Sequence, residues 1–153
     1  MNTANLYTVA EVQLTYKNHS DLMQRPQLQT TKEVVHIMRN IEGMQKNIDY
    51  KEVFYVIYLN QSSRILSVGK VSEGTTTSCL VNIRQILQGA LLQNATALII
   101  CHNHPSGCTN PSQQDRQITA KIKDAANFFD IQLLDSFVIS SFDYFSFSES
   151  GLL

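Results

Sequence analysis

The 153-residue chain lacks several features that would place it in a special class of proteins. It has no tryptophan, only three prolines and six glycines, and only 16% of its residues are charged. No apolar run approaches the roughly 20 residues that a membrane-spanning helix needs. The amino-terminal residues contain neither the basic segment nor the apolar segment of a signal peptide. We therefore expect a globular protein that stays in the cytoplasm.

Cysteine and net charge are also scarce. The three cysteines, Cys79, Cys101 and Cys108, are an odd number without the spacing of a disulfide framework, so idle or buried thiols in a reducing compartment are expected. Twelve Lys and Arg against thirteen Asp and Glu give a net charge of −1, which supplies no general attraction to nucleic acid or to an anionic membrane. A hydrophobic content of 43% is sufficient for the core of one domain.

Hydrophobic periodicity predicts strands that alternate with helices. Strands are expected within residues 6–16, at 52–60, 64–74, 95–100 and 131–140, and briefly within 143–150. Helices are expected from the Thr30 capping box to Gly43, at 81–93, and from an Asn110 cap with Pro111 to about residue 129.

Because hairpins occur beside strand–helix units, the pattern predicts an α/β sandwich, in which a mixed β-sheet is flanked by helices. We expect residues 1–50 to form an amino-terminal extension of strand and helix that packs on a main domain of residues 51–153.

The segment HNHPSGCTNPSQQD, residues 102–115, directly follows the apolar run ATALIIC. Side chains alternate along an extended segment, so His102 and His104 point the same way and offer two neutral nitrogen ligands. Asp115 falls near the start of the next helix, and the intervening loop can fold that helix start back against the end of the strand. Two histidines and a carboxylate form a catalytic zinc site that leaves a fourth position for water and lowers the pKa of that water to about 7. We therefore predict one Zn²⁺ per chain.

Cleavage of an amide needs more than a metal-activated water. A general base must take the water proton and pass it to the leaving nitrogen, and a donor must hold the oxyanion. Ser112, one helical turn before Asp115, is the predicted oxyanion donor. Glu52, an odd residue to find at the start of a buried strand, is the predicted base, and Glu73 is the alternative. The combination predicts metal-assisted amide hydrolysis.

These residues carry a resemblance to a known family. H-x-H followed after seven residues by S-x-x-D, with an upstream Glu on a strand, resembles the signature of the JAMM (MPN+) metalloproteases. The fuller string HNHPSG, with PS and Asp further on, is similar to their bacterial branch, the RadC family, sometimes labelled DNA-repair proteins. The resemblance extends over roughly residues 50–153.

The resemblance implies a JAMM/MPN fold, which is a cytidine-deaminase-like α/β sandwich, and hydrolysis of a peptide or isopeptide bond. It makes His102, His104 and Asp115 the zinc ligands, Ser112 the oxyanion donor and Glu52 the base.

The sequence departs from the RadC pattern in two ways. Ser136 stands where RadC-like chains usually have His. This position is not a metal ligand in the signature, so the change affects only a contact that supports the ligands or the surrounding structure. The family's amino-terminal helix-hairpin-helix region does not fit in the roughly 50 residues before the matching segment, so we do not expect DNA binding through it.

Other functions remain to be compared with hydrolysis. The principal alternative is a non-catalytic or weakly catalytic binding module in a DNA-repair or mobile-element complex. The contiguous letters HNH do not indicate the nuclease of that name, whose residues are dispersed, and a zinc deaminase would need H-x-E and P-C-x-x-C motifs. His19 and His36 are expected outside the site, Cys101 is expected to be buried, and Cys108 could add a regulatory thiolate. The sequence indicates no substrate, partner or oligomeric state.

Overall fold

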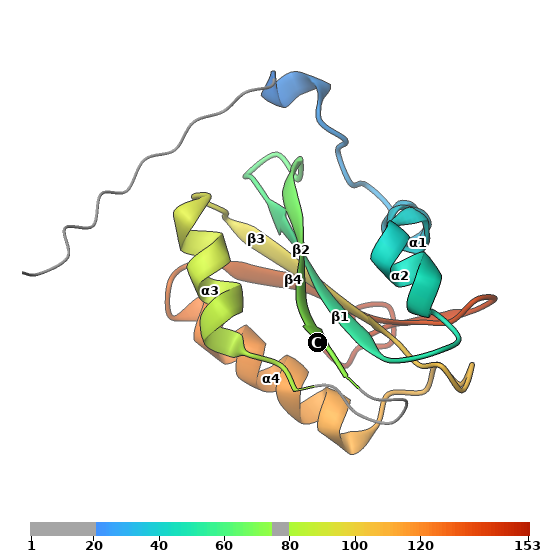
Figure 1. Cartoon of the computed structure of the whole chain (residues 1–153). Coiled ribbons are helices and arrows are strands. Elements are labelled where there is room, and N and C mark those ends of the chain that lie inside the picture. Colours follow the sequence, from blue (N-terminus) through green and yellow to red (C-terminus); the bar gives the residue numbers. More distant parts are fainter. Residues whose placement is uncertain (1–20, 75–79) are drawn as a thin grey trace, which may run out of the picture.

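A five-stranded mixed sheet forms the centre of the fold (Figure 1). The structure is a computed structural model that describes residues 21–74 and 80–153. Its strands are β1 (Val53–Leu59), β2 (Ile65–Glu73), β3 (Ala97–Asn103), β4 (Gln132–Ile139) and β5 (Tyr144–Ser146), in the spatial order β2-β1-β3-β4-β5. Only β3 and β4 are parallel neighbours. The strand expected within 6–16, His19 and Cys79 lie outside the described residues.

Helices cover both faces of this sheet. One face packs against α1 (Thr31–Asn40) and α2 (Glu42–Asn47), and the other against α3 (Ile83–Leu92) and α4 (Gln113–Asn127); a short 3-10 helix, η2 (Leu22–Gln24), precedes them. Alternation along β1 separates the two cores: Tyr55 and Ile57 pack with α1 and α2, whereas Phe54 and Val56 pack with α3 and α4. The predicted α/β sandwich is confirmed.

The helix predicted from Thr30 to Gly43 is two helices. Its start is confirmed, because the Thr30 side chain accepts a hydrogen bond from the backbone N–H of Glu33 and the Glu33 carboxylate accepts one from that of Thr30. The expected end is wrong: α1 ends at Asn40, and Gly43 lies inside α2. A Cβ at Gly43 would overlap the hydroxyl group of Tyr55, so this glycine allows close packing on the sheet and does not terminate a helix.

The predicted start of the third helix is also wrong. Ser112, not Asn110, caps α4, and Gln113 is its first residue. The Ser112 hydroxyl accepts a hydrogen bond from the backbone N–H of Asp115, and the Asp115 carboxylate accepts one from that of Ser112. This reciprocal pair satisfies two of the N–H groups that a helix start leaves without partners. The helix ends at Asn127, slightly earlier than expected.

None of the helices in the described part of the chain has both the length and the apolar character that crossing a bilayer requires.

The contact between α3 and β1 leads to a test of the packing. A Cβ at Gly89 would overlap the Tyr58 hydroxyl and lie 2.7 Å from Cζ of that ring. Without this contact, Ala would stabilise a helix by about 0.5–1 kcal/mol relative to Gly. We expect Gly89→Ala instead to lower the free energy of unfolding by about 1–3 kcal/mol, measured by urea denaturation. Gln88→Ala, at an exposed neighbour, is the control, and a more stable Gly89→Ala protein would contradict this packing.

Candidate metal centre

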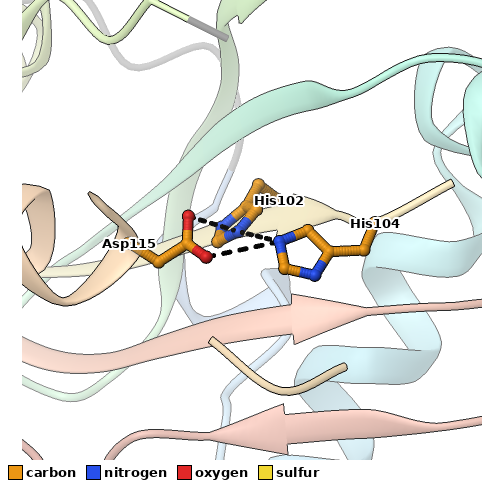
Figure 2. Close-up of side chains that lie close together, drawn as sticks. All are labelled: His102, His104 and Asp115. Carbon is orange, nitrogen blue, oxygen red and sulfur yellow. Dashed lines mark hydrogen bonds and ion pairs between the residues drawn. The ribbon is translucent and has the colours of Figure 1, made fainter. Parts of the chain in front are cut away.

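The end of β3 and the first turn of α4 bring His102, His104 and Asp115 together (Figure 2). His102 was expected just past the strand, but β3 extends to Asn103, so His102 lies within the strand and is only 2% exposed. His104 follows the strand, and its backbone N–H donates to the carbonyl of Ile139, 3.1 Å away. The sheet therefore holds the backbone of both histidines.

The polar atoms of these three side chains converge on one point. The Nε2 atoms of His102 and His104 are 3.1 Å apart; Nε2 of His102 lies 3.1 Å from one Asp115 oxygen, and Nε2 of His104 lies 3.3 Å from the other. Zinc ligands at 2.0–2.1 Å in a tetrahedral arrangement are separated by roughly 3.3 Å. The three residues could therefore hold a metal ion.

A backbone contact orients the His104 ring. Its Nδ1 lies 2.8 Å from the carbonyl oxygen of Cys108, which can only accept, so Nδ1 carries a hydrogen. In the neutral ring the lone pair is then on Nε2, directed at the Asp115 carboxylate and at His102. These groups repel one another unless a ring hydrogen of His102, an added proton or a metal ion lies among them. This chemistry fits a metal centre with a carbonyl that fixes the ligand tautomer.

The electrostatics of the cluster keep Asp115 ionised. Burial by itself would raise the pKa of Asp115, but hydrogen bonds from His102 and His104, with a further one from Ser112, lower it well below its usual range. The pKa of His104 is raised, first because its ring donates to the Asp115 carboxylate and also because of the bond to the Cys108 carbonyl. The negative charge therefore stays where a metal ion would be bound.

Ser112 contacts Asp115 directly. Its hydroxyl donates to the Asp115 oxygen Oδ2 at 2.7 Å, and its backbone N–H donates to the same atom at 2.7 Å. The predicted oxyanion donor is thus adjacent to the cluster, and in this arrangement its hydroxyl hydrogen orients the carboxylate.

A cleft of about 1010 Å³ opens beside the cluster. Its lining includes Glu52, Phe54, His104, Ser112 and Asp115, and its α4 wall continues to Lys121. The structure therefore places Glu52 in the same cleft as the candidate metal ligands. Burial raises the pKa of the Glu52 carboxyl, and the charge of Asp115 adds to this, while the two histidines oppose it.

Glu73 has different surroundings. Its carboxylate pairs with the ammonium groups of Lys51 and Lys70, and the hydrogen bonds from these lysines lower its pKa to about 2. Glu73 is not among the residues that line the cleft. A carboxylate held by two cations is a weak proton acceptor near neutral pH.

The cysteines lie on different sides of the site. Cys101 is buried on the face of β3 opposite His102, as expected, and burial raises the pKa of its thiol. Cys108 is exposed, and its side chain is not part of the three-residue group in the described structure. His36 is exposed on α1.

The ring of Phe54 beside His102 was not expected from the sequence. The Phe54 ring stacks on that of His102, with centroids 5.8 Å apart and planes inclined by 7°. Ser136, the position of the departure from the RadC pattern, is buried, and its hydroxyl lies 3.1 Å from that of Thr119 on α4. Asn103, which lies between the two histidines in the sequence, is completely buried, and its amide binds backbone groups, because a buried amide needs hydrogen-bond partners.

Comparison with known proteins agrees with this geometry. A family model described as the RadC-like JAB domain matches residues 28–152. A UPF0758 protein of Flavobacterium johnsoniae is 37% identical over 132 residues, which are 86% of this chain and 56% of that protein. A UPF0758 protein of Chlorobaculum parvum is 39% identical over 127 residues, 77% of this chain and 57% of that protein.

A UPF0758 protein of Photobacterium profundum is 45% identical over 103 residues, 67% of this chain and 46% of that protein. This chain thus spans less than two thirds of the length of these relatives. The match over residues 28–152 includes α1 and α2 as well as the cleft and the His-His-Asp group. The chain belongs to the RadC-like JAB domain family.

Proposed function

We propose that this chain is a zinc-dependent hydrolase of the JAMM metallopeptidase type that cleaves a peptide or isopeptide bond. The observation that carries the proposal is the convergence of two imidazole nitrogens and a carboxylate beside a cleft that also contains Glu52. Two neutral nitrogens and one oxygen are ligands typical of catalytic zinc.

His102, His104 and Asp115 would hold the metal. When bound, zinc would lower the pKa of a coordinated water to about 7 and polarise the carbonyl group of the substrate. Asp115 brings one negative charge, and the carbonyl of Cys108 keeps the Nε2 lone pair of His104 available.

Glu52 is the proposed general base. A base works best when its pKa lies near the operating pH, and burial moves the pKa of Glu52 in that direction. Its carboxylate would accept a proton from the attacking water and deliver it to the leaving nitrogen. Glu73 has a lowered pKa and two lysine partners, so we assign it a structural role.

Ser112 is the proposed oxyanion donor. Its hydroxyl already donates to Asp115, so this role requires the hydroxyl to rotate from Asp115 toward the substrate oxygen. The backbone N–H of Ser112 would still hold the carboxylate when the hydroxyl turns, because it donates to the same oxygen independently.

Metal binding can be tested by thermal unfolding of the metal-free protein. We expect one Zn²⁺ per chain and, at about 100 times the dissociation constant, a stabilisation of about 2.7 kcal/mol, which raises Tm by roughly 5–11 °C. The His104→Ala variant should lose this shift because it lacks a ligand. His36→Ala, a change at an exposed histidine on α1, is the matched control and should keep it. Undiminished zinc affinity in His104→Ala would contradict the site.

The zinc affinity should depend on pH. A proton and a metal ion compete for Nε2 of His104, and the Asp115 carboxylate raises the pKa of this histidine above its ordinary value of 6.5. Affinity should therefore be constant well above that raised pKa and fall as the pH drops through it. Competition with a chelator from about pH 8 to about pH 5 measures this dependence, and a constant affinity over that range would show that His104 is not a ligand.

The base is tested by two matched substitutions. We expect Glu52→Gln to lower the hydrolysis rate by about 10²–10⁴-fold while zinc binding and the free energy of unfolding stay unchanged. Glu73→Gln should keep the rate and lose at most the modest stability of partly exposed ion pairs. The probe is a quenched-fluorescence library of peptides that includes amides of the lysine side chain. Equal losses in the two variants would remove the reason for assigning the base to Glu52.

A further inference from the structure

Asn103, the residue between the two histidines, holds the chain segment that carries Glu52. Its Oδ1 accepts a hydrogen bond from the backbone N–H of Val53 at 2.8 Å. Its Nδ2 faces three backbone carbonyl oxygens, those of Asn47 at 3.1 Å and of Ile48 and Lys51 at 3.0 Å each. Only one orientation of the amide places its acceptor on the N–H and its donors on the carbonyls.

These bonds lie on both sides of Glu52. The carbonyl of Lys51 precedes Glu52 and the N–H of Val53 follows it, and Asn103 binds both. The carbonyl of Glu52 accepts from the N–H of Gly74 at 2.9 Å, which fixes the same backbone to the segment after β2. The backbone of Glu52 is thus held by two separate parts of the fold.

The strand register explains why this matters for the metal centre. Phe54 pairs with His102 in the antiparallel ladder, and continuing that register places Val53 opposite Asn103 and Glu52 opposite His104. Alternation then puts the Glu52 side chain on the face of the sheet that carries His102 and His104. The Asn103 side chain lies on the other face, toward the end of α2. One strand end therefore carries ligands on one face and an anchor for Glu52 on the other.

We propose that Asn103 is a positioning residue, which sets the distance between the Glu52 carboxylate and the side chains of His102, His104 and Asp115 by holding residues 51–53 to β3. The expected effect on the rate rests on the proposed function. The hydrogen bonds by which Asn103 holds residues 51–53 do not depend on it. A misplacement of about 1 Å can reduce the rate of an enzyme about 10²-fold, so loss of the anchor should act on kcat. Asn103 touches neither ligand atoms nor substrate, so zinc binding should be preserved.

The test compares two substitutions of Asn103 with one matched control. Asn103→Ala removes all four bonds. Asn103→Asp keeps an acceptor for the N–H of Val53 but, when ionised, cannot donate to the three carbonyls. The control is Asp135→Ala, because Asp135 is also buried on the sheet and also binds backbone N–H groups, those of Ser136 and Ser148, together with the Ser146 hydroxyl. Asp135→Ala should therefore lower Tm without moving Glu52.

Amide hydrogen exchange followed by NMR reports on the anchor without any hydrolysis. In Asn103→Ala, the exchange rate of the Val53 amide should rise by about tenfold or more relative to that of Ile57, in the middle of β1. In Asn103→Asp the Val53 amide should stay protected. If Asn103→Ala fails to fold, Asn103→Asp still supplies the kinetic comparison.

The kinetic measurement uses the zinc-loaded full chain and the quenched-fluorescence peptide library. We expect kcat to fall by about 10–10²-fold in both Asn103 variants, with KM and zinc affinity within about threefold of the parent protein. Asp135→Ala should keep kcat within about threefold of the parent value, even if its Tm falls as much as that of the Asn103 variants.

The proposal would be overturned by unchanged Val53 exchange in Asn103→Ala, by unchanged kcat in the Asn103 variants, or by an equal loss of kcat in Asp135→Ala. A parallel loss of zinc affinity would show that Asn103 positions the ligands and not Glu52, and would overturn it too. Failure of the proposed function looks different, because the parent protein would then bind zinc and hydrolyse no member of the library. In that case the exchange of Val53 still decides whether Asn103 anchors the segment.

Discussion

The site depends on an electrostatic requirement. Two imidazole Nε2 atoms and a carboxylate meet within hydrogen-bond distance, and the carbonyl of Cys108 assigns the Nδ1 hydrogen of His104. The Nε2 lone pair of His104 and the Asp115 carboxylate then converge on one point, which is stable only with a hydrogen or a metal ion between them. The ionised state of Asp115 has the same origin, because hydrogen bonds from the histidines outweigh the effect of burial on its pKa.

The sheet holds this arrangement in place. β3 pairs with β1 on one side and β4 on the other; His102 and Asn103 are its last two residues, and His104 follows directly. Asp115 comes from α4, whose start is fixed by the same Ser112 that donates to the Asp115 carboxylate. The helix cap and the orientation of the Asp115 carboxylate are therefore one set of hydrogen bonds. Glu52 directly precedes β1, and the Asn103 side chain holds its neighbours through the N–H of Val53 and the carbonyl of Lys51.

Membership of the RadC-like JAB domain family accounts for the fold and for the presence of the His-His-Asp group. The relatives described above are known as UPF0758 proteins, and this chain spans 56% and 57% of the first two of them. The substrate of the cleft is therefore a question for experiment on this chain. The cleft is lined by α4 residues from Gln113 to Lys121, which include Ile118, and by the apolar side chains of Leu80 and Val81.

Local patterns in the sequence determined the mixed α/β architecture, the Thr30 capping box and the three residues that could bind a metal, because periodicity, caps and ligand spacing are properties of short segments. Only the tertiary structure decided why Gly43 lies inside a helix and that Glu52 rather than Glu73 lines the cleft. Both depend on contacts between segments that are apart in the sequence: Tyr55 with Gly43, Lys51 with Glu73, and Asn103 with Val53. Such contacts exist only after the sheet has formed, so no local pattern in the sequence reports them.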